Sequence, residues 1–327
     1  MAVSPTISIV EPTIASPEAL LQAALHLKQG GLVALPTETV YGLGADAENP
    51  DAIAKIYKAK NRPSNHPLII HLAETADVFH WAKDIPDYAH ALMAKFWPGP
   101  MTLILPRTSN SKDFVTGGQL SVGLRIPNHP VALSLLAGFR VLGGKGIAAP
   151  SANRYGAVSP TTAQAVSHEL GDYLASDDLI LDGGNSEVGV ESTIIDCTGP
   201  NPAILRPGAI TAEDIELCTG IVVAEPAAVT VRVSGSHKQH YSPKAKVVIG
   251  GNPTPGEGLI APHEIETPAG VIRLADPKSV AEYARILYSA LRAADEQGLA
   301  VVRVISPEGD GLAIAIRDRI NRSAAQG

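Results

Sequence analysis

Residues 16–60 read SPEALLQAALHLKQGGLVALPTETVYGLGADAENPDAIAKIYKAK, and their alternation of patterns decides the fold. Ser16 and Pro17 are typical of the first positions of a helix, and the leucines of residues 20–27 supply its apolar face. A Gly-Gly pair predicts the end of this helix, and the apolar run at 32–35 predicts a short buried strand. A second helix is expected to begin at Asn49-Pro50. Helices that alternate with buried strands indicate a layered α/β domain.

The same alternation continues outward from this stretch. Further buried strands are predicted at 67–72, 101–105 and 122–126, which implies a large central sheet. A short helix is expected to run to about residue 217, and no clear periodicity follows until residue 246. Strands at 247–249, 271–274 and 300–305, a helix capped by Asp276 and a last helix from Gly311 then predict a smaller Rossmann-like α/β unit. We therefore expect a first domain over 1–218, a linker over 219–243 and a C-terminal domain over 244–327.

Composition excludes several classes of protein. The chain has 327 residues, of which 45% are hydrophobic and 18% charged, and its formal net charge is −7. An acidic chain with few aromatic residues is not expected to bind nucleic acid stably. The two cysteines, Cys197 and Cys218, provide neither a disulfide framework nor a Cys-rich metal site. Without a secretory signal or an apolar run of 18 residues, we expect a cytoplasmic protein that does not span a membrane.

Polar side chains follow two of the predicted buried strands. Thr37 and Thr39 come directly after the strand at 32–35, and Ser151 and Asn153 follow the apolar run that ends at 149. Ligands of open α/β sheets bind beyond the carboxyl ends of strands, so these positions are candidates for a binding site. Threonine side chains also stabilise ordinary turns, and Ser159 before Pro160 is equally typical of a helix N-cap.

The helix from residue 50 ends in four cations with different helical phases. Lys60 is seven residues after Ile53 and shares its apolar, inward face, whereas Lys55 and Lys58 point toward solvent. A solvated lysine at a helix C-terminus complements the helix dipole, but an inward lysine needs a partner or an anion. Lys60 is therefore a candidate anion ligand.

Several familiar motifs are absent. The glycine spacing of residues 138–146 approaches that of a P-loop, but the Lys-Ser/Thr pair does not follow it. No GxSxG elbow supports a serine nucleophile, and the pairs His66/His71 and His237/His240 lack a third metal ligand at a strong spacing. We therefore expect no protein-bound metal. Hydroxyls, amides and inward cations without a nucleophile indicate a site that positions a phosphate compound.

A resemblance to a known family takes the interpretation further. The segments PTETVYGLG at 36–44, KNRP at 60–63, PLIIH at 67–71, PSAN at 150–153, GVEST at 189–193 and LRPG at 205–208 resemble the YrdC-like family in order. The paired Lys-x-Arg and Ser-x-Asn signature of that family appears as Lys60/Arg62 and Ser151/Asn153. The match extends over about 15–212, and His240-Tyr241-Ser242-Pro243 with the α/β tail resembles the additional domain of the long form, the threonylcarbamoyl-AMP synthases.

The resemblance implies a YrdC-like twisted mixed sheet, a Rossmann-like C-terminal domain and a nucleotidyltransferase. The implied reaction combines L-threonine, bicarbonate or CO2, and ATP into threonylcarbamoyl-AMP and pyrophosphate, with Mg²⁺ accompanying ATP. A separate threonylcarbamoyl transferase complex would use the product for t6A at position 37 of tRNAs that read ANN codons. The implied catalytic set is the paired signature, Lys60, Arg62, Ser151 and Asn153. The implied threonine contacts are Thr37, His71, Arg125, Ala149 and Ser192, and the implied ATP contacts are Lys60, Ser64, Ser121, Ser151, Ser159, Arg206 and Tyr241.

The chain departs from the family pattern in few places, among them Arg317-Asp318-Arg319, which replaces a common asparagine-containing pattern. A hydrogenase-maturation carbamoyltransferase would use the same core, but it adds Cys-rich zinc fingers that two distant cysteines cannot form. A tRNA- or double-stranded-RNA-binding module without catalysis is a second alternative. The long linker is interpreted as a cover of the active site as well as a tether, with a flexible spacer as the alternative.

Overall fold

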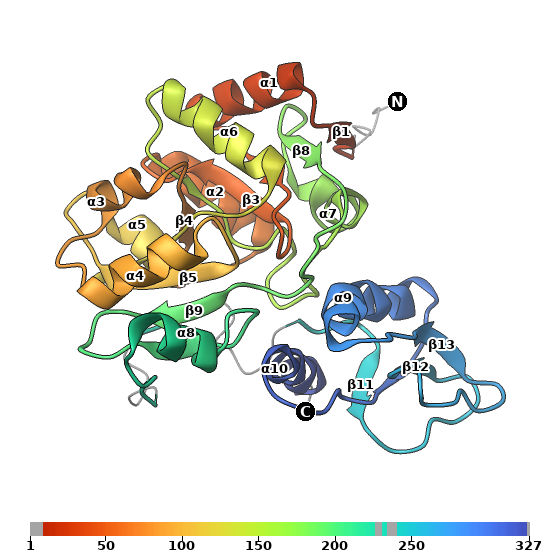
Figure 1. The fold of residues 1–327 in the computed structure, drawn as a ribbon. Coiled ribbons are helices and arrows are strands. Elements are labelled where there is room, and N and C mark those ends of the chain that lie inside the picture. The colour runs from red at the N-terminus through yellow and green to blue at the C-terminus, as the bar shows by residue number, and fades with distance from the viewer. Residues whose placement is uncertain (1–8, 226–230, 234–240, 326–327) are drawn as a thin grey trace, which may run out of the picture.

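The computed structural model describes residues 9–225, 231–233 and 241–325. Within these residues the chain forms two α/β domains, each built on its own sheet. Figure 1 shows the first domain as the larger one, with α9 and α10 of the C-terminal domain facing it. The predicted fold class and the two-domain organisation are confirmed.

The first domain contains a ten-stranded mixed sheet. Its strands lie in the order β1-β8-β2-β3-β7-β4-β6-β5-β9-β10. Parallel pairs, such as β4 with β6, alternate with antiparallel pairs, such as β2 with β3 and β5 with β6. The strands are β1 (Pro12–Ile14), β2 (Val33–Leu35), β3 (Gly42–Asp46), β4 (Ile69–His71), β5 (Met101–Pro106), β6 (Ser121–Arg125), β7 (Ile147–Ala148), β8 (Leu179–Asp182), β9 (Thr193–Asp196) and β10 (Ala203–Arg206).

Helices cover both faces of this sheet. Along β2, Val33 and Leu35 pack into the core cluster with α1 and α6, whereas Leu32 and Ala34 pack into the cluster of the opposite face. This alternation is the period-two pattern of a strand buried on both sides. The first domain's helices are α1 (Pro17–Lys28), α2 (Pro50–Lys60), α3 (Val78–Trp81), α4 (Asp87–Phe96), α5 (Asp113–Thr116), α6 (Pro130–Val141), α7 (Ala163–Leu170) and α8 (Ala212–Thr219), with 3₁₀ turns at Thr75–Asp77 and Gly171–Tyr173.

The sequence patterns at the helix ends correspond to observed caps. Ser16 accepts a hydrogen bond from the backbone N–H of Ala19, and Asn49 caps α2. The predicted phases of α2 are confirmed, because Lys60 is buried while Lys55 and Lys58 are exposed. The glycine-rich segment 138–146 is the last turn of α6 followed by the connection to β7.

The C-terminal domain has a four-stranded parallel sheet in the order β11-β14-β12-β13. Its strands are β11 (Lys246–Ile249), β12 (Gly258–Ile260), β13 (Ile272–Ala275) and β14 (Val301–Val304), and its helices are α9 (Val280–Glu296) and α10 (Leu312–Ala324). The two helices pack against each other and against the sheet. The glycine-containing strand β12 was not predicted from the sequence.

The predicted start of α9 is wrong. The helix begins at Val280, and Ser279 caps it by accepting a hydrogen bond from the backbone N–H of Glu282. Asp276 does not cap the helix, because its carboxylate pairs with Arg273 and His263 of the preceding segment, each at 2.8 Å. Two capping residues three positions apart compete in the sequence, and the tertiary partners of Asp276 decide between them.

The described part of the predicted linker lies on the first domain. Ala224 forms a β-bridge with Ala203, and Val233 joins a small apolar cluster with Ile104 and Ile194. Tyr241 is buried between the two domains. His237, Lys238 and His240, which the lid hypothesis invoked, lie outside the described residues. No described helix combines the length and the apolar character that a membrane span requires.

Candidate active site

The connection from β2 to β3 forms one wall of the candidate site. The Thr37 hydroxyl donates to the carbonyl of Val40 at 2.6 Å and accepts from the backbone N–H groups of Thr39 and Val40. Thr37 therefore stabilises a turn, as the structural alternative predicted, and it also lines the cavity described below. Its hydroxyl lies 2.9 Å from that of Thr39, so the turn fixes both hydroxyls.

Arg125 lies at the end of β6 with its guanidinium held on several sides. Its Nε donates to the carbonyl of Gly99 at 3.2 Å, and its Nη1 donates to the Thr39 hydroxyl at 2.9 Å. Its Nη2 lies 2.7 Å from the carboxylate of Glu38 in a buried ion pair. A guanidinium has five N–H groups, so each Nη keeps a second N–H. N–H groups therefore remain on both Nη atoms, and a guanidinium with such groups can bind a ligand carboxylate.

His71 lies beside Arg125, because the parallel register of β4 and β6 pairs these two residues. Its ring is buried, and among the described residues Nδ1 has no hydrogen-bond partner. Burial, and then the charge of Arg125, lower the pKa of His71 to about 3. The ring is therefore neutral at pH 7, and Nδ1 can accept a hydrogen bond from a ligand.

The Lys-x-Arg and Ser-x-Asn segments meet as the sequence signature implies. The Lys60 ammonium donates to the carbonyl of Ser151 at 2.6 Å and to the carbonyl of Asn153. Burial, and then the neighbouring Arg62, lower the pKa of Lys60 well below its ordinary value. Lys60 thus holds the loop of residues 151–153 from behind, whereas Arg62 lines the cavity.

The conformation of Asn61 explains why the side chains of Lys60 and Arg62 lie in different places. Asn61 ends α2 in the left-handed conformation at φ 52°, which turns the chain directly after Lys60. Arg62 then donates to the carbonyl of Pro67 at 3.0 Å, and its guanidinium lies over the ring of Tyr155.

The loop before β9 forms the opposite wall. Arg206 donates through Nε to the carbonyl of Ser192 and through Nη2 to its hydroxyl, both at 3.1 Å. The Ser192 hydroxyl also lies 2.8 Å from that of Thr102. The side chain of Ser192 is therefore oriented by two strands of the sheet.

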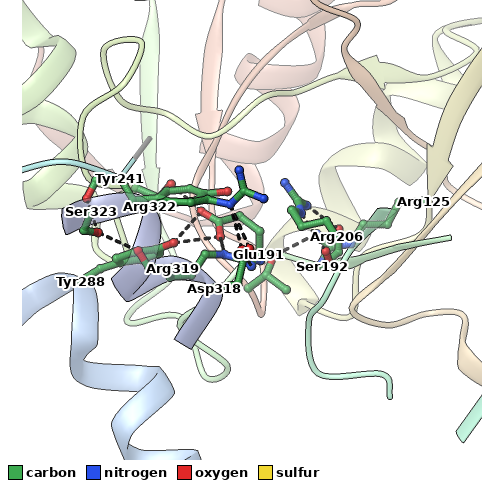
Figure 2. Close-up of polar contacts among 12 residues, drawn as sticks. Arg125, Glu191, Ser192, Arg206, Tyr241, Tyr288, Asp318, Arg319, Arg322 and Ser323 are labelled. Atoms are coloured by element: carbon green, nitrogen blue, oxygen red, sulfur yellow. Dashed lines mark hydrogen bonds and ion pairs between the residues drawn. The ribbon is translucent and has the colours of Figure 1, made fainter. Parts of the chain in front are cut away.

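Glu191, adjacent to Ser192, is the centre of an interdomain cluster (Figure 2). Its carboxylate accepts hydrogen bonds from Ser159 at 2.6 Å, Tyr288 at 2.9 Å and Arg319 at 2.8 Å. Burial alone would raise the pKa of Glu191, but Arg319 and Arg206 outweigh it and lower the value to about 2. The carboxylate is ionised at pH 7, and two of its three partners come from the C-terminal domain.

Close backbone packing accompanies this cluster. Gly189 has φ 79°, and a Cβ atom at that position would lie 2.4 Å from the Ala284 carbonyl oxygen in α9. Only glycine allows both the left-handed backbone and this approach. The GVEST segment is thus a contact with the C-terminal domain as well as a wall of the site.

One cavity unites these walls, with about 540 Å³ when space open to solvent is counted. All five predicted threonine contacts line it, together with Arg62, Ser151, Arg206 and Tyr241. The remaining predicted residues do not line this cavity. Ser64 is exposed, and Ser121 faces residues 231–233. Ser159 donates a hydrogen bond to Glu191, and Lys60 and Asn153 lie behind Ser151. Ser159 therefore has a structural partner other than the backbone of a helix N-terminus.

Three residues of the cluster had no assigned role in the sequence interpretation: Glu191, Tyr288 and Arg319. Arg319 carried a detectable signal, because it follows Ala315 and Ile316 by four and three residues and so shares their helical face. The structure shows that its side chain is fully buried there. The inward phase that singled out Lys60 applies equally to this arginine.

The fold and the site define a two-domain α/β protein with an enclosed pocket rich in arginine and hydroxyl groups. Family models match residues 26–208, described as telomere recombination, and 210–325, described as threonylcarbamoyl-AMP synthase, C-terminal domain. The chain is 39% identical to the threonylcarbamoyl-AMP synthase of Pyrococcus abyssi, covering 92% of this chain and 93% of the relative. It is 38% identical to that of Bacillus subtilis, with 93% and 92% covered.

The structural comparison agrees. The crystal structure of P. abyssi Sua5 complexed with L-threonine superimposes with a TM-score of 0.86 at 35% identity, covering 96% of both chains. The chain belongs to the threonylcarbamoyl-AMP synthase family, in its long two-domain form.

Proposed function

We propose that this chain is an L-threonylcarbamoyladenylate synthase that acts in the cytoplasm on L-threonine, bicarbonate or CO2, and ATP. The observation that carries the proposal is the single cavity lined by all five family threonine contacts and by two buried arginines, Arg62 and Arg206. The threonine bound to the P. abyssi relative supports the choice of amino acid.

Threonine binds at the Arg125 end of the cavity. The two remaining N–H groups of Arg125 hold its carboxylate, and the neutral His71 accepts a hydrogen bond from its amino group. The Ser192 hydroxyl, which has one hydrogen-bonding site left beside Arg206 and Thr102, orients the substrate hydroxyl. Thr37 shapes the wall through its turn, and Ala149 contacts the methyl group of the substrate. This arrangement leaves the amine accessible to the carbon donor.

ATP occupies the remainder of the cavity, toward Arg62, Ser151, Arg206 and Tyr241. The arginines stabilise negative charge on the phosphates. The only acidic side chain among the described lining residues is Glu191, whose carboxylate is already engaged by three donors. Oxygen ligands for Mg²⁺ are therefore supplied by the triphosphate itself, and the ion neutralises phosphate charge when bound.

The reaction follows from this placement. The neutral threonine amine attacks the carbon of CO2 and releases one proton to solvent, or attacks bicarbonate and releases water that carries the N–H proton. Either route gives the carbamate N-carboxythreonine. A carboxylate oxygen of this carbamate then attacks the α-phosphorus of ATP. The bond to the β,γ-phosphates breaks and pyrophosphate leaves, so the product is threonylcarbamoyl-AMP. Both species are expected to be sensitive to water, and closure of the cavity around the bound substrates would exclude it.

The product is passed to a separate threonylcarbamoyl transferase complex for t6A modification at position 37 of tRNAs that read ANN codons. No stable nucleic-acid binding by this chain is needed, in keeping with its net charge of −7.

Mass spectrometry of the purified protein with ATP, bicarbonate and L-threonine tests the proposal. We expect a threonylcarbamoyl adenylate and pyrophosphate, with neither formed when threonine or ATP is omitted. Isotopically labelled bicarbonate should label the carbamoyl carbon. Salt-dependent RNA binding without ATP turnover would instead identify a nucleic-acid-binding module.

A further inference from the structure

The C-terminal domain contacts two residues that line the cavity. In the first domain, Glu191 receives Tyr288 from α9 and Arg319 from α10. In the linker, Tyr241 stacks on the Tyr288 ring at 5.6 Å between centroids, and its carbonyl accepts a hydrogen bond from Ser323 at 2.8 Å. The face formed by α9 and α10 thus supports the wall of the cavity that contains Glu191 and Tyr241.

Arg319 is the residue of this face that joins both contacts through one charged group. Its Nε bonds the Glu191 carboxylate at 2.8 Å, and its guanidinium lies 5.4 Å from the centre of the Tyr241 ring. The side chain has no exposed surface and is not among the residues that line the cavity. Arg319 therefore acts on the cavity only through its neighbours (Figure 2).

We infer that Arg319 is a positioning residue for the synthesis reaction, which fixes Glu191 and Tyr241 so that the C-terminal domain completes the active site of the first domain. The inference rests on the proposed function, because the substrates it concerns are those assigned above.

The physical reason is the cost of an uncompensated buried charge. Without Arg319, the Glu191 carboxylate keeps only hydroxyl donors from Ser159 and Tyr288. It must then take up a proton or move toward Arg206, the other cation that lowers its pKa. Arg206 orients Ser192 through two hydrogen bonds, so a shift of Glu191 misplaces the threonine side of the wall.

The test compares Arg319→Met with Arg319→Lys, which are similar in length and differ in charge. We expect Arg319→Met to raise the KM for threonine about 10-fold and to lower kcat/KM about 100-fold, the scale of a misplaced substrate. Arg319→Lys keeps a cation beside Glu191 and Tyr241 and should retain at least about a tenth of the activity. A smaller folded fraction would lower apparent kcat but leave KM unchanged.

A matched control breaks another contact between the same two domains. Arg292 of α9 donates to the Val158 carbonyl at 2.7 Å and pairs with Glu169, away from the cavity lining. Arg292→Met should change the threonine KM less than about 2-fold. An equal change in Arg292→Met and Arg319→Met would show that domain docking alone matters, and would overturn the inference.

Two further variants test the route through Glu191. Tyr288→Phe removes one hydroxyl donor and keeps the ring, so a loss of about 3- to 10-fold is expected without unfolding. The double variant Arg319→Met/Glu191→Gln should be no less active than the less active of the two single variants. The losses of residues that act as a unit are not additive. Multiplicative losses would contradict this route.

Amide hydrogen exchange separates failure of the inference from failure of the proposed function. Peptides that contain residues 189–193 should exchange faster in Arg319→Met than in Arg292→Met, whether or not the protein makes the adenylate. Absence of product from the wild-type protein would defeat the proposed function alone. Unchanged exchange at 189–193 would defeat the inference alone.

Discussion

The two ends of the cavity are supported by different parts of the molecule. At one end, Arg125 is held by Glu38, Thr39 and Gly99, all from the first domain. At the other end, the ionised Glu191 depends on Tyr288 and Arg319 of the C-terminal domain. The Arg125 contact for threonine is therefore built into one domain, whereas the wall of Glu191, Ser192 and Tyr241 requires both.

The difference between the two ends lies in which elements form each of them. The first-domain sheet alone provides the register of His71 beside Arg125 and the turn that fixes Thr37. The second end consists of a linker residue and a loop that approaches α9 through Gly189. Variants at the Arg125 end should consequently affect threonine alone, whereas variants at the second end should affect ATP through Tyr241 and threonine through Ser192.

Lys60→Ala should have the largest effect, because the Lys60 ammonium holds the loop that carries Ser151, a residue of the cavity lining. Its loss leaves two buried carbonyls of the 151–153 loop without their donor. We expect kcat/KM to fall by more than about 100-fold while the fold is retained, measured as adenylate formation and circular dichroism.

Lys58→Ala is the matched control, since Lys58 lies on the exposed face of the same helix. Its activity should remain within about 2-fold of the wild type. Similar losses in both variants would contradict the assignment by helical phase.

Arg125→Lys should disrupt the threonine end alone. Lysine keeps the charge but not the two parallel N–H groups that bind a carboxylate. The kcat/KM for threonine should fall about 10- to 100-fold, with little change in the KM for ATP. The exposed Arg140, paired with Glu74 and Asp77, provides the control Arg140→Lys.

Amino-acid selectivity gives an independent measure of the same end. Serine lacks only the methyl group, so its rejection is limited to about 10- to 200-fold. Valine cannot use the remaining hydrogen-bonding site of the Ser192 hydroxyl and should be rejected more strongly. Turnover of valine above that of serine would contradict the proposed pocket.

The same contrast explains what the sequence could predict. The pocket of the first domain follows local patterns: capped helices, buried strands and polar segments at strand ends. Helical phase alone indicated that Lys60 faces inward, and the family resemblance implied Arg125 and Ser192. The sequence could also indicate that Arg319 faces inward, but not toward which partner, because Glu191 lies 128 residues away. Contacts between domains depend on docking, for which periodicity gives no signal.

Tyr241→Ala should weaken the second end. Tyr241 lines the cavity, and its ring is held between Tyr288 and Arg319. Removing the ring should raise the KM for ATP about 10-fold while the KM for threonine changes less. Titration of a non-hydrolysable ATP analogue measures this directly. An unchanged affinity for the analogue, with full activity, would make Tyr241 part of a tether only.

The smallest expected effect concerns how stability depends on pH, and it assigns a separate pH range to each end. The native pKa of His71 is lowered from 6.5 to about 3 by burial and by Arg125. The unfolded chain therefore binds a proton that the native chain does not, and stability falls as the pH decreases from about 6.5 toward 3. Glu191, lowered from 4.5 to about 2, contributes in the same direction, but only below about pH 4.5. Each group adds at most about 1.4 kcal/mol per pH unit.

Urea unfolding measures the free energy of unfolding at each pH. Its slope against pH should be shallower between pH 6.5 and 4.5 in His71→Asn, and shallower below pH 4.5 in Glu191→Gln. The exposed His90 gives the control His90→Gln, whose slope should match that of the wild type. If Glu191→Gln flattens the upper range, or His71→Asn leaves it unchanged, the charges at the two ends are not arranged as described.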